Sequence, residues 1–154
     1  MIARLLINLL KQMLEAYRRQ RLKHLGAGTR IGDTKIIGPE NVSIGSNTSL
    51  GGRVYLYAVD QITIGDNCMI GWNTVVTTAT HDYKSKPMSA VLKKPVRIGN
   101  DVWLGLNVTI LPGVSIADGV VVGAGSVVTK SILEPEVIVA GNPARLLKHR
   151  FEDQ

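Results

Sequence analysis

The stretch Ile98–Val128 reads IGNDVWLGLNVTILPGVSIADGVVVGAGSVV, and its repeat decides the fold. An aliphatic residue returns at every sixth position, namely Ile98, Leu104, Ile110, Ile116, Val122 and Val128. A period of six is even, so in an extended chain it brings these side chains to one face, whereas a helix needs recurrences at three and four. The stretch is therefore predicted to be extended chain with one apolar face.

Residues that favour turns recur with the same period. A small or polar residue follows most of the aliphatic positions: Gly99, Gly105, Ala117, Gly123 and Thr129. Residues that tolerate a left-handed backbone stand nearby: Asn100, Asp101, Asn107 and Asp118. Short strands that turn at regular corners describe the hexapeptide class of parallel β-helix, in which three strands make a coil of about eighteen residues.

The same phase continues toward the N-terminus with two slips. The predicted inward positions there are Leu25, Ile31, Ile37, Ile44, Leu50, Leu56, Ile64, Ile70 and Val76. The chain from about residue 26 to residue 133 is thus predicted to wind as about five coils, stacked roughly 4.8 Å apart. Cys68 belongs to a second inward set with Val102, Val108 and Val120, so we expect a buried and inert thiol.

One segment, THDYKSKPMSAVLKKPVRIG at residues 80–99, interrupts the period. We expect it to be a loop extruded from the solenoid over about residues 80–96. The loop contains His81, the only histidine outside the terminal segments. Functional sites are often placed on loops that a rigid scaffold holds. From the residues alone, His81 is either a candidate for chemistry or a solvated loop histidine.

The composition limits the class of protein. With 154 residues, 45% of them hydrophobic and 19% charged, the chain has the character of one globular domain. An aromatic share of only 5% beside 16 glycines predicts an aliphatic core interrupted by many turns. The single Cys68 excludes an intramolecular disulfide, and no Cys/His cluster has zinc spacing, which favours a cytoplasmic location.

The first 24 residues form a separate basic segment that raises the net charge of +6. Its apolar residues follow the spacing of one helical face: Ile2, Leu5, Leu6, Leu9, Leu10, Met13, Leu14 and Tyr17. Its longest apolar run is too short to span a bilayer, and no small-residue cleavage site of a secretory signal follows it, so we expect neither a membrane span nor a secretory signal. We expect an amphipathic helix that covers the first coil, contacts an anionic membrane surface, or does both.

Three motifs carry a resemblance to a known family: THDY at residues 80–83, the hexad run that ends in GAGSVVTKSI at residue 132, and AGNPARLL at residues 140–147. Together they resemble the hexapeptide-repeat acetyltransferases, in the branch that contains galactoside, maltose and bacterial polysaccharide O-acetyltransferases. The resemblance covers most of residues 30–147. It implies a left-handed coil, a hand that the period itself does not set, and a homotrimer with active sites in the clefts between neighbouring prisms.

The fold class expected from these observations is an all-β solenoid with an N-terminal amphipathic helix. Residues 1–24 form the helix, residues 25–147 form a left-handed β-helix acyltransferase domain, and residues 148–154 form a C-terminal tail. The resemblance implies transfer of an acetyl group from acetyl-CoA to a saccharide hydroxyl, in surface polysaccharide biosynthesis. The acceptor is expected to be a small-molecule or lipid-linked saccharide, with no nucleic acid as partner, and the protein is placed in the cytoplasm or at the inner face of the membrane.

The resemblance assigns catalytic roles to two residues. His81 matches the catalytic histidine of the family, and a base is needed because an alcohol is a poor nucleophile until its proton is removed. Transfer is direct, with no acyl-enzyme. The tetrahedral intermediate needs a preorganised donor for its oxyanion, and the matching backbone N–H belongs to Leu106.

The resemblance also places coenzyme A. Its pantetheine arm is expected along the small corner residues Gly105, Gly123 and Ala124. Its distal part is expected near Thr129, Lys130 and Arg145, because cations suit phosphates. Trp103 either packs beside the acceptor or coenzyme arm, or covers the gap between subunits.

The galactoside branch has acidic and amide residues before the middle IGDN motif that hold the sugar. In this sequence the candidates at that place are Tyr57 and Asp60, which do not stand in the same register, so the acceptor site has diverged. Asp82 could orient His81 or bind sugar, although an adjacent residue in a strand points the other way.

Three alternatives remain. An amino-sugar N-acetyltransferase is the nearest. A zinc carbonic anhydrase on the same prism needs about three histidines, and His24 and His149 lie in the terminal segments, so no metal is expected. The third alternative is a non-catalytic solenoid used as a binding module.

Overall fold

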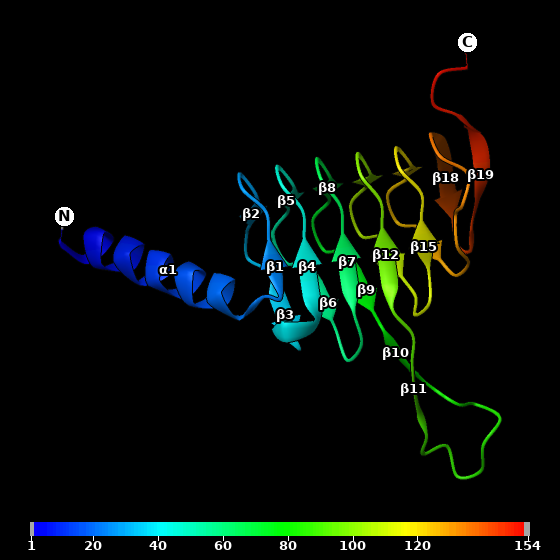
Figure 1. Ribbon diagram of the computed structural model, residues 1–154, viewed down its shortest axis with the longest axis horizontal. Helices are drawn as coiled ribbons and strands as arrows, with labels where there is room; N and C mark the ends of the chain where they lie inside the picture. The colour runs from blue at the N-terminus through cyan, green and yellow to red at the C-terminus, as the bar shows by residue number, and fades with distance from the viewer. Residues whose placement is uncertain (1, 153–154) are drawn as a thin grey trace.

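The computed structural model describes the backbone of residues 2–152 and the side chains of residues 3–10, 12, 13 and 21–152. The chain is a parallel β-solenoid with one helix, α1 (Ile2–Arg21), at its N-terminal end (Figure 1). This confirms the predicted class of fold, an all-β solenoid preceded by a helix.

Three parallel sheets form the walls of the prism, and each sheet takes one strand from each coil. The first wall contains β1 (His24–Leu25), β4 (Val42–Ile44), β7 (Ile62–Ile64), β12 (Val96–Ile98) and β15 (Ser115–Ile116). The second contains β2 (Arg30–Ile31), β5 (Ser49–Leu50), β8 (Met69–Ile70), β13 (Trp103–Leu104), β16 (Val121–Val122), β18 (Val137–Gly141) and the antiparallel β19 (Ala144–His149). The third contains β3 (Lys35–Ile37), β6 (Tyr55–Tyr57), β9 (Val75–Thr77), β14 (Thr109–Ile110) and β17 (Val127–Val128). A short 3₁₀ helix, η1 (Pro39–Asn41), links β3 to β4.

The hexad positions fill the interior of the prism. All six aliphatic residues of the stretch 98–128 are at most 3% exposed. Because the strands pair in register, equivalent hexad residues of successive coils stack in a column: Leu104 lies beside Ile70 on one side and Val122 on the other. The predicted second inward set is confirmed as well: Cys68, Val102, Val108 and Val120 are all 0% exposed.

The inward phase differs from the prediction at Ile37. Ile37 is 40% exposed, and Ile36 packs against the core and pairs with Leu56. The turn from Ile31 to Thr34 leads from the second wall to the third and is one residue shorter than the later turns between these two walls. Within it, the Thr34 N–H donates to the Gly32 carbonyl at 2.7 Å. A shortened turn advances the phase by one residue and so reverses the side-chain faces of β3.

The corners also differ in part from the prediction. Asp101 and Asn107 have the expected left-handed backbone, with φ of 55° and 56°. Asn100 and Asp118 instead use their side chains to join successive coils. Asp118 accepts a hydrogen bond from the Asn100 N–H (2.8 Å), and Asn100 accepts one from the Asp66 N–H (2.9 Å). These polar side chains satisfy backbone donors at a corner where no strand partner is available.

Cys68 is buried as predicted. Its Sγ lies 3.1 Å from the Gly99 carbonyl oxygen, and burial raises the pKa of the thiol above its usual value. A thiol that stays protonated and out of contact with solvent is a poor nucleophile.

Helix α1 projects from the first coil away from the prism, as Figure 1 shows. Its described large apolar side chains are all more than half exposed: Leu5, Leu6, Ile7, Leu9, Leu10 and Met13. These side chains therefore do not cover the first coil within one chain. Among the described residues, no helix is long and apolar enough to cross a membrane.

Candidate active site

The predicted loop leaves the prism after β9, and its base is a two-stranded hairpin. Strand β10 (Ala79–His81) pairs antiparallel with β11 (Val91–Lys93), so that His81 lies opposite Val91 and Ala79 lies opposite Lys93. Figure 1 shows this hairpin extending from one side of the prism. His81 ends β10 with an exposed side chain, where a substrate can approach it.

Thr78 fixes the base of the hairpin to the previous coil. Its hydroxyl donates to the Tyr57 carbonyl (3.0 Å) and accepts from the Asp60 N–H (2.9 Å). Its own carbonyl accepts from the Lys94 N–H at 2.9 Å, where the chain returns to the prism. The structure therefore brings two predicted acceptor residues, Tyr57 and Asp60, to the base of the hairpin that carries His81. Thr78 was not among the residues predicted for the site, and it is one of several buried threonines of the prism, at 0% exposed.

The two predicted carboxylates near this corner both bond to the backbone close to them in sequence. One oxygen of Asp60 accepts from the Gln61 N–H (2.7 Å). One oxygen of Asp82 accepts from the Lys84 N–H (3.0 Å) and closes the turn that follows β10. Among the described interactions, no hydrogen bond or ion pair joins the Asp82 carboxylate to His81.

Leu106 lies at the corner between β13 and β14. Its carbonyl accepts from the Gly125 N–H (2.8 Å), whereas no hydrogen bond within the described part of the chain uses its own N–H. A backbone donor that has no partner within the chain, at a corner residue that is itself exposed, is suited to an oxyanion, because it costs no reorganisation when the charge develops.

A single chain does not bring His81 and Leu106 together. Leu106 precedes β14, and His81 follows the neighbouring parallel strand β9, so the two residues lie at opposite ends of the third wall. The residues predicted to be the base and the oxyanion donor therefore do not meet within one chain.

The small corner residues are required by the stacking of the coils. A Cβ on Gly105 would lie 2.6 Å from the Ala124 backbone nitrogen, and a Cβ on Gly123 would lie 2.8 Å from the Ala140 Cβ. Trp103 lies half-exposed on the adjoining wall, between Met69 and Val121.

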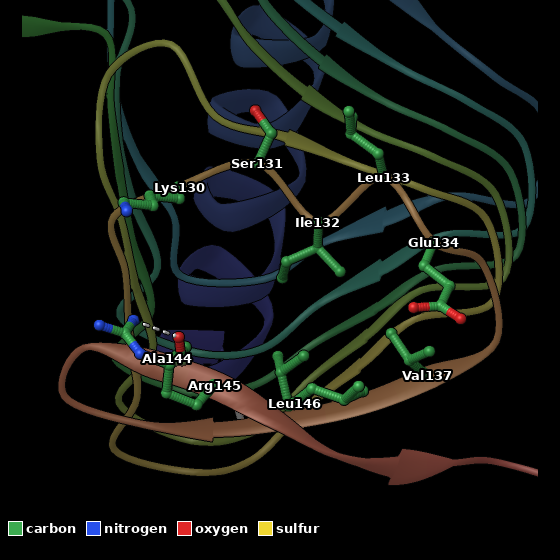
Figure 2. A pocket seen from close by; sticks show the side chains of 10 residues that line it. Lys130, Ser131, Ile132, Leu133, Glu134, Val137, Ala144, Arg145 and Leu146 are labelled. Carbon is green, nitrogen blue, oxygen red and sulfur yellow. Dashed lines mark hydrogen bonds between the residues drawn. The ribbon is translucent and has the colours of Figure 1, made fainter.

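Lys130 and Arg145 line one cavity of about 410 Å³ at the C-terminal end of the prism. Figure 2 shows both side chains on the same side of this cavity, with Ile132, Leu133 and Leu146 among the apolar lining. The Arg145 guanidinium donates to the Ala144 carbonyl at 3.0 Å, which leaves its other donors available. The structure thus brings together two residues that are far apart in the sequence. Thr129 is exposed beside Lys130 but does not line the cavity.

The remaining histidines lie apart from His81. His24 belongs to β1 in the first coil, and His149 lies on β19, 3.4 Å from the Glu134 carboxylate. Within the described residues, no three His, Cys, Asp or Glu side chains come together as a metal site.

Comparisons with known proteins agree with this architecture. The model of the hexapeptide repeat of succinyl-transferase matches residues 41–78 and 95–130, on either side of the hairpin. A solved hexapeptide-repeat acetyltransferase from Vibrio cholerae, complexed with acetyl coenzyme A, is 32% identical with a TM-score of 0.87. The match covers 92% of this chain and 79% of that chain.

Two curated relatives come from Escherichia coli strain K12. Galactoside O-acetyltransferase is 40% identical over 118 residues, which cover 71% of this chain and 58% of that protein. A protein assigned to colanic acid biosynthesis as an acetyltransferase is 38% identical over 120 residues, covering 78% of this chain and 65% of that protein. The chain thus spans less than two thirds of the length of these curated relatives.

The repeat that builds the prism, the hairpin that interrupts it and the shared fold lead to one assignment. The chain belongs to the hexapeptide-repeat acetyltransferase family.

Proposed function

We propose that this protein transfers an acetyl group from acetyl-CoA to a saccharide hydroxyl, with His81 as the general base. The observation that carries the proposal is the exposed His81 at the end of β10. This strand belongs to the hairpin that leaves the described prism between the two segments matched by the hexapeptide repeat. The acetyl coenzyme A in the Vibrio structure and the galactoside named for the Escherichia coli relative support the choice of donor and acceptor.

The reaction follows from the chemistry of the two sites. His81 accepts the hydroxyl proton while the acceptor oxygen attacks the thioester carbonyl, and the Leu106 N–H donates to the oxyanion that forms. The intermediate then collapses, the C–S bond breaks, and the proton on His81 passes to the departing coenzyme A sulfur. The buried Cys68, with its raised pKa, supports direct transfer without a covalent enzyme intermediate.

We propose further that the active form is a homotrimer. The separation of His81 from Leu106 in one chain supports a site between copies, and the resemblance to the family implies three of them. The edge near Leu106 carries large exposed apolar side chains that a neighbouring prism would cover: Met69, Trp72, Trp103 and Leu106. Sedimentation equilibrium is expected to give three times the chain mass of 16.7 kDa.

The cavity with Lys130 and Arg145 is proposed to hold the phosphate end of coenzyme A. Lys130→Ala and Arg145→Ala are each expected to raise KM for acetyl-CoA roughly tenfold with less change in kcat, because a charge-assisted hydrogen bond contributes about 1.5–3 kcal/mol. Steady-state kinetics at saturating acceptor would measure this. Lys148→Ala removes a nearby exposed cation outside the cavity lining and serves as control. An unchanged KM in both cavity variants would place the phosphates elsewhere.

Helix α1 is proposed to hold the enzyme at an anionic membrane surface, where lipid-linked saccharides are assembled. The proposal is supported by the exposed leucines of α1 and by the basic residues of the same segment.

Removing residues 1–20 is expected to abolish sedimentation with phosphatidylglycerol vesicles at low salt and to leave the melting temperature of the prism nearly unchanged. Phosphatidylcholine vesicles are the control for charge. A destabilised or aggregating truncated protein would show instead that the helix acts as a cap. Full-length protein that ignores anionic vesicles would remove the membrane role.

A screen of acetyl-CoA consumption tests the proposed function. Galactosides, maltose and short polysaccharide fragments are compared with matched amino sugars, and acetylated products are identified by mass spectrometry. Ester products from hydroxyl acceptors are expected. Amide products alone would favour the N-acetyltransferase, and absence of both turnover and coenzyme A binding would favour a non-catalytic module.

A further inference from the structure

The two strands of the hairpin place a cation on the same face as His81. Side chains alternate between the two faces of a strand, and residues opposite each other in an antiparallel pair share a face. The observed register therefore puts His81, Val91, Ala79 and Lys93 on one face and puts Thr80 and Leu92 on the other.

Lys93 can reach the surroundings of His81. The two residues are diagonal neighbours on that face, a relation that places their Cα atoms roughly 7–8 Å apart and within reach of long side chains. The residue opposite Lys93 is the small Ala79, so the direct cross-strand neighbour of Lys93 adds only a methyl group to this face.

No acidic partner occupies the Lys93 ammonium. In the described part of the chain, no carboxylate lies within 4.0 Å of the Lys93 ammonium. The nearest acid in sequence on the hairpin, Asp82, already accepts from the Lys84 N–H.

The other lysines of the loop have different surroundings. Lys94 packs along the Gly113 corner, where its Cδ lies 3.1 Å from the position that a glycine Cβ would occupy. The Lys84 ammonium lies 6.0 Å from the centre of the Tyr83 ring. Lys86 is exposed in the connection beyond the paired strands. Lys93 is therefore the loop lysine that the strand register places beside the base.

We propose that Lys93 determines acceptor specificity by binding an anionic group, a carboxylate or a phosphate, on the saccharide that His81 deprotonates. This inference rests on the proposed function, because it concerns the acceptor of the same site. The anion belongs to the acceptor and not to coenzyme A, since the pantetheine arm separates the thioester from the phosphates.

The test compares three acceptors that differ in charge: methyl galactoside, its uronic acid counterpart methyl galacturonide, and galactose 1-phosphate. The readout is the ratio of kcat/KM for each anionic acceptor to kcat/KM for the neutral one. Lys93→Gln is expected to lower this ratio roughly tenfold for the preferred anion, and Lys93→Glu is expected to lower it further. The two anionic arms show whether the group is a carboxylate or a phosphate.

Lys86→Gln removes the same charge beyond the paired strands and is expected to leave the ratio within twofold of wild type. General damage to the hairpin would lower kcat/KM for all acceptors and leave the ratio unchanged. An unchanged ratio in both Lys93 variants would overturn the inference, as would a KM effect confined to acetyl-CoA.

Binding without turnover separates this inference from the proposed function. Calorimetry with methyl galacturonide or galactose 1-phosphate is expected to show weaker binding to Lys93→Gln than to wild type. Lys93-dependent binding without any acetyl transfer would count against the proposed function only. Equal binding, or no binding of either anion to wild type, would count against the role of Lys93.

Discussion

His81→Ala is expected to lower kcat by about two to four orders of magnitude, the contribution of a positioned general base. The imidazole accepts the proton of the acceptor hydroxyl during attack, and alanine offers no group that can do so. The side chain is exposed and outside the core, so the variant should fold and bind acetyl-CoA like wild type. Single-turnover kinetics and equilibrium binding of acetyl-CoA would separate the chemical step from binding.

His149→Ala is the matched control. The His149 side chain is partly exposed on β19, at the C-terminal end of the prism, and lies 3.4 Å from the Glu134 carboxylate. Its kcat is expected to remain within about twofold of wild type. Turnover retained in His81→Ala, or an equal loss in both variants, would remove His81 from the catalytic role. The buried Cys68 would not replace it, since the thiol is 0% exposed.

Leu104→Ala is expected to lower the free energy of unfolding by about 2–5 kcal/mol. Leu104 is fully buried in the column between Ile70 and Val122, and truncation would leave a cavity that two rigid neighbouring coils cannot close. For a chain of this size, the loss corresponds to a fall of roughly 10 °C in melting temperature. Thermal unfolding followed by circular dichroism would measure it.

Leu147→Ala makes the same substitution at a side chain that is 63% exposed on β19. It is expected to change the free energy of unfolding by less than about 0.5 kcal/mol. If both leucine variants lose the same stability, the inward column does not hold the coils together. If neither loses stability, the hexad positions are not the core.

The sequence by itself determined the solenoid, because its information is local and periodic. An even repeat of aliphatic residues can bury one face only as extended chain, and this reasoning placed Leu104, Val122 and Cys68 inside the prism. It failed at Ile37, where a turn one residue shorter changed the face of the strand. Turn length leaves little trace in a hydrophobic pattern, so a slip of one residue is found only from the hydrogen-bond register.

The predicted site residues could be identified from the sequence, but their arrangement in space could not. The motif resemblance singled out His81, Lys130 and Arg145, and the tertiary structure then decided which of them are neighbours. Lys130 and Arg145 share a cavity because β19 folds back onto β18, a pairing that no repeat encodes.

Only the tertiary structure separated His81 from Leu106 and placed Lys93 beside His81. Both results depend on pairings between strands, of β9 with β14 and of β10 with β11. A hexad repeat states which side of the chain is apolar, but it does not state which residues of other strands stand opposite. That choice is made by backbone hydrogen bonds between segments distant in sequence, and for this reason the composition of the site was decided only in the folded chain.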